Sequence, residues 1–222
     1  MFTGISSFFF PATEKITLIE GLVQWRKRAG NDDPQVVTEI EALIRVFIAQ
    51  KKFDAAEQLL DEALPPSFAQ QPSSVKLLAL RIDLRGRRGQ LQAAASDAAL
   101  ALRHQPNNSE RYCVLAALLA KTDDRAGYEQ LCRKFFTTFR GTTNIYVADQ
   151  LAKTCLLLPF SEVDLKMIDH LADTALTHGS GDKFAMPFFQ VCKSVVRIPP
   201  GPLRRRRRVG SKTAQKLHRQ LA

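Results

Sequence analysis

Apolar residues recur every three or four positions through residues 36–64, in two runs separated by a polar break at residues 50–52. Asp33-Pro34 precedes the first run and Pro65-Pro66 follows the second, which are signals for a helix start and a helix end. The pattern predicts two short amphipathic helices joined by a tight turn, near residues 34–64. The apolar positions of the two runs are Ile40, Leu43, Ile44, Phe47, Ile48, Phe53, Ala56, Leu59, Leu60, Ala63 and Leu64.

The same pattern returns further along the chain. It predicts helix pairs near residues 74–104, 109–140 and 143–178, followed by a lone helix at residues 183–196. Glycine or paired aspartate residues mark the turns inside the second and third pairs, and proline follows the second pair. The sequence therefore predicts an all-α chain built from helix pairs.

Aligning the first three pairs makes a repeat visible, with steps of 38 and 34 residues. Most aligned positions are apolar or small. Arg81 and Arg85 are exceptions in the second pair, and Tyr128 replaces a small residue in the third. The aligned sets are Ile40, Leu43, Ile44, Phe47, Ala56, Leu60 and Ala63; Leu78, Arg81, Ile82, Arg85, Ala94, Ala98 and Ala101; and Tyr112, Leu115, Ala116, Leu119, Tyr128, Cys132 and Phe135.

This spacing of large, small and closing-proline positions resembles the tetratricopeptide repeat (TPR), whose period is about 34 residues. Residues 22–64, which include KKFDAAEQLLDEAL, resemble the longer repeats of kinesin light chains. Residues 105–192, which include RAGYEQLCRKFFTTFRGTTN, resemble a TPR region of large bacterial proteins that carry kinase or WD40 domains. The resemblance implies a TPR-like right-handed α-solenoid of antiparallel helix pairs over residues 13–196.

The resemblance also implies a function, that of a bacterial protein–protein interaction scaffold and a fragment of a larger multidomain protein. In TPR proteins, partners contact first-helix positions that point away from the packed side. Charged candidates at such positions suit an acidic peptide or a C-terminal carboxylate. The alternative interpretation is a solvated helix face of mixed charge. The candidates are Arg45, Lys76, Asp83, Arg87 and Lys121.

Enzymatic activity is not expected. The chain has no Gly-rich phosphate loop and no kinase HRD or DFG motif. His170 and Asp173 share a helix face, but no third ligand accompanies them, so neither a metal site nor a cofactor is expected. The four cysteines (Cys113, Cys132, Cys155 and Cys192) lie far apart in apolar helical context and are expected to be buried reduced thiols.

The apolar runs of the sequence indicate whether the chain enters a membrane or is secreted. No run approaches the length of a membrane span, so no membrane contact is expected. Phe8-Phe9-Phe10 has no preceding positive residue and is cut short by Pro11, which argues against a secretory signal. A cytoplasmic protein is therefore expected, with a poorly ordered leader at residues 1–12.

The net charge of +10 is concentrated in the C-terminal tail. Nine of the 32 basic residues lie in residues 197–222, which contain no acidic residue, so residues 1–196 carry only +1. The tail is expected to be disordered. Its arginine run supports an alternative function, sequence-nonspecific binding of nucleic acid or another polyanion, through Arg204, Arg205, Arg206, Arg207 and Arg208.

A second interpretation treats the tail as an out-of-frame translation of a lost repeat. The lone helix at residues 183–196 stops where its partner helix is due. Codons shifted by one base from Arg197 onward permit the string EYRQGHFA and then an alanine-rich run, which suits a TPR turn and second helix. Without that helix, residues 183–196 should expose apolar surface, and we expect either self-association or fraying of this segment.

Overall fold

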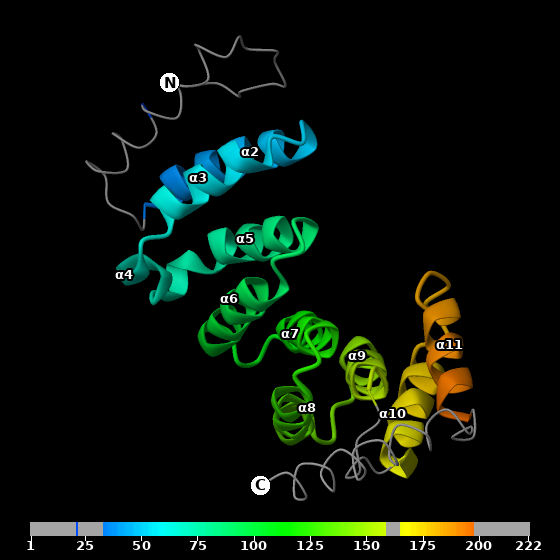
Figure 1. Cartoon of the computed structure of the whole chain (residues 1–222). Helices are drawn as coiled ribbons and strands as arrows, with labels where there is room; N and C mark the ends of the chain where they lie inside the picture. Colours follow the sequence, from blue (N-terminus) through cyan, green and yellow to red (C-terminus); the bar gives the residue numbers. More distant parts are fainter. Residues whose placement is uncertain (1–20, 22–32, 159–164, 198–222) are drawn as a thin grey trace, which may run out of the picture. The chain divides into compact units, whose positions relative to one another are not determined.

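The computed structural model describes residues 21, 33–158 and 165–197, and all regular structure in these segments is helical (Figure 1). The prediction of an all-α chain is therefore confirmed. The leader at residues 1–12 and the tail after Arg197 lie outside the described residues. The described helices form two compact units that divide between Pro106 and Asn107.

The first unit contains two long helix pairs and a short helical linker. Helix α2 (Pro34–Ala49) packs against α3 (Phe53–Ala63), and α5 (Val75–Arg87) packs against α6 (Leu91–His104). Helix α5 also contacts α2 and α3, so the two pairs share one core. Its largest fully buried side chains are Ile40, Ile44, Phe47, Leu59, Leu60, Phe68, Leu77 and Leu78.

Local sequence signals explain where these helices begin and end. The Asp33 carboxylate accepts hydrogen bonds from the backbone N–H groups of Gln35 and Val36, at 2.8 and 3.4 Å, and thereby caps α2. Pro34 occupies the first helical turn, where its missing N–H costs nothing. Helices α3 and α6 each end two residues before a proline, which biases the preceding residue away from helical geometry.

The turns inside the first three pairs share one backbone geometry. Lys51, Gly89 and Asp123 have positive φ angles of 57°, 74° and 56°, and they recur at the 38- and 34-residue steps of the aligned sequence. The backbone N–H that follows each of them donates to the carbonyl five residues earlier, at 2.8, 2.9 and 3.0 Å. This is the Schellman ending of a helix. The repeat inferred from apolar positions is thus also present in the backbone.

The linker between the first two pairs contains helical structure of its own. It forms α4 (Pro66–Ala69) and a 3₁₀ turn at Pro72–Ser74. Phe68 is fully buried, and so is Ser74, whose hydroxyl donates to the Ala69 and Gln71 carbonyls at 3.1 and 2.7 Å. The linker is therefore part of the core of the first unit.

The second unit contains two further pairs and a final helix. Helix α7 (Ser109–Lys121) packs against α8 (Arg125–Phe139), and α9 (Ile145–Leu156) packs against α10 (Leu165–His178). Helix α9 also contacts α7 and α8, and the final helix α11 (Met186–Arg197) contacts α10 and α9. The buried rings of Tyr112 and Phe135 stack with their centroids 4.5 Å apart and join α7 to α8.

Tyr128, which replaces a small residue in the aligned repeats, connects α8 to the end of α9. Its buried hydroxyl donates to the Thr154 carbonyl at 2.6 Å and accepts from the Leu158 N–H at 3.1 Å. It therefore satisfies backbone groups that the end of α9 leaves without helical partners.

Candidate protein-binding face

Four of the five candidate binding residues lie in the first unit. Arg45 is on α2, and Lys76, Asp83 and Arg87 are on α5; all four are exposed. The three α5 residues are seven and four positions apart, a spacing that places them along one face of the helix. The fifth candidate, Lys121, is an exposed residue in the last turn of α7, in the second unit.

We call Arg45, Lys76, Asp83 and Arg87 the charged face. Two of its cations already have acidic neighbours on their own helices. Arg45 donates to one oxygen of Glu41, with its closest nitrogen at 2.8 Å, and Arg87 Nε lies 3.0 Å from an oxygen of Asp83. Such exposed pairs stabilise a helix by only about 0.3–0.5 kcal/mol. A carboxylate of a partner can therefore replace either acid at small cost.

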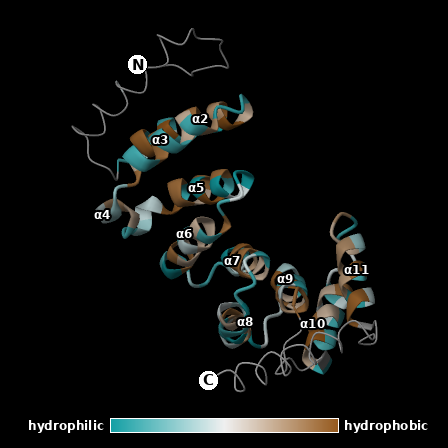
Figure 2. Ribbon diagram, in the orientation of Figure 1, coloured by the Kyte–Doolittle hydropathy of each residue, from teal (hydrophilic) through white to brown (hydrophobic). Residues whose placement is uncertain are grey.

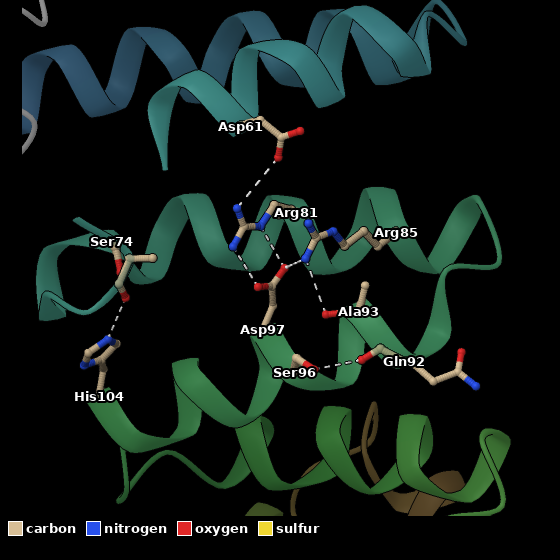
Figure 3. Close-up of polar contacts among 10 residues, drawn as sticks. Asp61, Ser74, Arg81, Arg85, Gln92, Ala93, Ser96, Asp97 and His104 are labelled. Carbon is tan, nitrogen blue, oxygen red and sulfur yellow. Dashed lines mark hydrogen bonds and ion pairs between the residues drawn. The ribbon is translucent and has the colours of Figure 1, made fainter. Parts of the chain in front are cut away.

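On the side of α5 that faces α6, an ion-paired cluster is buried (Figure 3). Arg81 donates to both oxygens of Asp97, from Nε and Nη2, each at 2.8 Å. Arg85 Nη1 donates to Asp97 at 2.6 Å and lies 3.5 Å from the Ala93 carbonyl. The three side chains are only 11%, 19% and 6% exposed, in the order Arg81, Arg85, Asp97.

This cluster holds α5 to α6 by charge where the first pair uses apolar residues. In the 38-residue register, Arg81, Arg85 and Asp97 correspond to Leu43, Phe47 and Leu59. Two guanidinium groups share one buried carboxylate, and Asp61 on α3 approaches Arg81 only to 3.9 Å with its side chain 59% exposed. The alignment of the repeats singled out the two arginines but not Asp97. The available signal was that Asp97 aligns with an apolar residue, Leu59, of the first pair.

Other polar contacts fix the ends of the same helices. Arg88, just after α5, lies 2.6 Å from Asp54 and 3.4 Å from Glu57, both on α3. The hydrogen bond with Asp54 raises the pKa of Arg88. At the other end, the His104 ring Nε2 lies 3.1 Å from the Ala69 carbonyl and ties α6 to the linker. The C-terminal end of α5, which carries three residues of the charged face, is therefore tied to α3, and the C-terminal end of α6 is tied to the linker.

The second unit carries buried thiols and a buried carboxylate. Cys132, Cys155 and Cys192 are buried free thiols, and Cys113 is partly exposed, with its sulfur 3.3 Å from the Thr154 hydroxyl. The hydrogen bond with Cys132, together with burial, raises the pKa of Cys155. Burial raises the pKa of Cys192 to about 11. Thiols held protonated in this way are poor nucleophiles.

Asp149 on α9 is also buried, and burial raises the pKa of its carboxyl. Its Oδ2 accepts a hydrogen bond from Lys153 at 2.7 Å, whereas Oδ1 has no hydrogen-bond partner among the described residues. Only one of the two carboxylate oxygens therefore has a hydrogen bond that replaces its lost contact with water.

The described residues contain no group of three or more His, Cys, Asp or Glu side chains able to hold a metal ion. Asp169 and Asp173, which lie one and three positions from His170 in sequence, instead flank the buried Lys193 ammonium at 2.5 and 2.7 Å. In the described part of the chain, no helix has the length and apolar character needed to cross a membrane.

Comparison of the chain with models of known protein families gives no match, and comparison with curated protein sequences gives none either.

Proposed function

We propose that this protein is a non-enzymatic, cytoplasmic interaction scaffold of the TPR type, in which antiparallel helix pairs stack as a right-handed α-solenoid. Two observations support the architecture. The same helix ending recurs at residues 51, 89 and 123, and each first helix packs against the second helix that follows it. A stack of equivalent pairs offers its first helices as one binding surface.

The partner that suits the charged face is an acidic peptide segment. Lys76 is an exposed cation, and Arg45 and Arg87 can exchange the acid on their own helix, the half-buried Glu41 or the exposed Asp83, for an acid of the partner. Arginine binds a carboxylate through two parallel hydrogen bonds, which adds specificity to the charge attraction. The observation that carries this proposal is the placement of Lys76 and Arg87 along one side of α5, on a helix anchored by the buried Arg81–Asp97 pair.

A peptide-display selection on the immobilised full chain tests this function. We expect the recovered peptides to be rich in Asp and Glu, and we expect Lys76→Glu and Arg87→Glu to abolish their binding. Arg103→Glu is the matched control, because Arg103 is an exposed arginine on α6, away from the charged face. If no peptide family is enriched, or if the control weakens binding as much as Arg87→Glu does, the proposed face is wrong.

A second candidate function rests on the tail composition, namely binding of nucleic acid or another polyanion through residues 204–208. Each phosphate that a cation neutralises releases counterions, so such binding weakens steeply as salt is added. Single-stranded DNA binding by the full chain should be compared with that of a variant in which these five arginines are glutamine. Tail-dependent, salt-sensitive binding without any peptide enrichment would favour this second function.

A further inference from the structure

Helix α11 is attached to the second unit by a small part of its surface. Figure 2 shows hydrophobic residues along the helix, but only some of them are covered. Phe189 and Cys192 are buried, at 1% exposure each, whereas Phe188 and Val191 are 54% and 59% exposed. The buried side lies against α10 and, to a smaller extent, against α9. Apolar burial therefore holds α11 less firmly than it holds α9, which also packs against α7, α8 and α10.

A buried ion cluster supplies a second attachment, and we call Lys193, Asp169 and Asp173 the Lys193 cluster. The Lys193 side chain on α11 is only 7% exposed, and its ammonium lies 2.5 Å from Asp169 and 2.7 Å from Asp173, both on α10. It also lies 3.4 Å from the Asp169 carbonyl oxygen. The two aspartate side chains are 43% and 53% exposed, so water still reaches them. The buried ammonium therefore needs the two acids more than the acids need the ammonium.

The contact between α11 and α9 buries an acid. Burial, followed by the charge of the Asp149 carboxylate beside it, raises the pKa of the Cys192 thiol to about 11. Asp149 on α9 is itself buried, and the loss of water raises the pKa of its carboxyl. When α11 moves away, Cys192 no longer covers this carboxylate and water can reach it. Opening of α11 therefore relieves part of the desolvation of Asp149.

We propose that α11 opens from α10 and α9 as one piece while the rest of the second unit stays folded, and that the Lys193 cluster is the contact that keeps it closed. Helix α9 retains its contacts with α7, α8 and α10 when α11 leaves. Proteins open in cooperative pieces of this kind, and the pieces with few buried contacts open most easily. The second unit thus has a closed state and an open state, in which the covered sides of α9 and α10 are accessible. The proposal does not depend on the charged face of α2 and α5.

Thiol labelling of the full chain measures this opening, because Cys192 lies on α11 and Cys155 lies on α9. Both side chains are buried, at 1% and 3% exposure. The chain is treated with an aromatic disulfide reagent, and mass spectrometry follows the labelling of each cysteine over time. Without urea, we expect Cys192 to be labelled about tenfold faster than Cys155 or more, because local opening exposes Cys192 without global unfolding. Low urea should accelerate Cys155 steeply and Cys192 little, because local opening exposes less surface than global unfolding.

Asp169→Asn combined with Asp173→Asn tests the Lys193 cluster. The closed state of this variant buries an unpaired ammonium, whereas the open state leaves it in water, so labelling of Cys192 should become about tenfold faster or more. Adding Lys193→Met to the same variant should return Cys192 to the slow rate of the natural sequence, because an apolar side chain needs no acid. Glu110→Gln is the matched control, since Glu110 is an exposed acid of α7 in the same unit, and it should leave the rate unchanged.

A core variant separates local opening from global unfolding. Phe135 is fully buried on α8, away from α11, so Phe135→Leu should accelerate the labelling of Cys155 and leave that of Cys192 unchanged. Equal rates for Cys192 and Cys155 in the natural sequence, or equal acceleration of both by Phe135→Leu, would show that α11 opens only when the whole unit unfolds. An unchanged Cys192 rate in the double aspartate variant would show that the Lys193 cluster does not hold the helix closed.

Discussion

Arg81 donates two hydrogen bonds to Asp97, and each is 2.8 Å long. Arg85 donates to the same carboxylate at 2.6 Å, so a single buried acid compensates two nearly buried cations. In the repeat register these three residues stand where the first helix pair has Leu43, Phe47 and Leu59. The second pair thus joins its two helices by a buried charge cluster, at positions where the first pair has apolar side chains.

Removing Asp97 alone should be costly. Asp97→Ala leaves two guanidinium groups without their shared carboxylate, and breaking a buried ion pair in this way costs about 3–5 kcal/mol. The free energy of unfolding, measured by urea titration, should fall by that amount. Asp83→Ala is the control, because its pair with Arg87 is exposed and contributes little.

Replacing the whole cluster should restore stability. The triple variant Arg81→Leu, Arg85→Phe, Asp97→Leu copies the residues of the first pair. Exchanging a buried ion cluster for well-packed apolar residues is often neutral or stabilising by about 1–4 kcal/mol. A triple variant no more stable than Asp97→Ala would mean that the two pairs are not equivalent at these positions.

The shared turn geometry predicts opposite effects at three equivalent residues. Lys51 and Asp123 hold positive φ angles that cost a non-glycine residue roughly 1–2 kcal/mol, whereas Gly89 adopts the same geometry freely. Lys51→Gly and Asp123→Gly should therefore raise the free energy of unfolding slightly, by about 0.5 kcal/mol after the entropy of glycine is counted. Gly89→Ala should lower it by about 1 kcal/mol or more.

A Cβ at position 89 would meet no atom within 4 Å, so the loss at Gly89 is a backbone effect and not a steric clash. Thermal melts of the three variants check these signs. If Gly89→Ala is as stable as the natural sequence, the turn does not need its left-handed residue.

Asp149 should make the chain less stable as pH rises through the acidic range. Burial raises the pKa of its carboxyl, so the folded state binds more protons than the unfolded state between the ordinary aspartate pKa and the raised one. Stability falls with rising pH across that window and stays constant above it. Asp149→Asn should remove this dependence and raise the melting temperature at pH 7.

Asp182 is the control of opposite sign. The hydrogen bond from Tyr146 lowers the pKa of its carboxyl. The contribution of Asp182 to the free energy of unfolding is therefore present above the ordinary aspartate pKa and is lost as pH falls. Melting temperatures across the acidic range should therefore change in opposite directions for Asp149→Asn and Asp182→Asn. Parallel changes would show that Asp149 is not buried as described.

The thiols should react slowly in the native protein. Cys132, Cys155 and Cys192 are at most 3% exposed. The hydrogen bond with Cys132 and burial raise the pKa of Cys155, and burial raises the pKa of Cys192. An aromatic disulfide reagent should label all four cysteines in urea and, without urea, react first at the partly exposed Cys113. The Cys113→Ser variant identifies that signal. Rapid native labelling of Cys155 would contradict the packing of α9.

The helix pairs were predictable because apolar periodicity, proline and capping residues act locally. Asp33-Pro34 and Asn144 mark the starts of α2 and α9 in the sequence itself, and both side chains cap these helices. The open apolar surface at residues 183–196 was also predicted, because Phe184, Phe188 and Val191 exceed what one neighbouring helix can cover. That prediction is confirmed.

Contacts between helices were harder to predict. Arg81 on α5 pairs with Asp97 on α6, and Lys193 on α11 pairs with Asp169 on α10. Because the partners lie on different helices, no local sequence pattern indicates either pair. The linker helix α4 was missed because four residues between prolines are too few to show a period. Phe68 was the remaining clue, because it is a large apolar residue between two predicted helix pairs.

Hydrogen–deuterium exchange of the full chain, with and without an acidic peptide recovered by display, shows whether the charged face binds the peptide. We expect slower exchange on peptide binding in residues 34–49 and 75–87, the helices α2 and α5 that carry the charged face. Lys76→Glu should abolish this protection, and Arg103→Glu should not. Protection confined to residues 91–104 or to residues 198–222, with α2 and α5 unchanged, would contradict it.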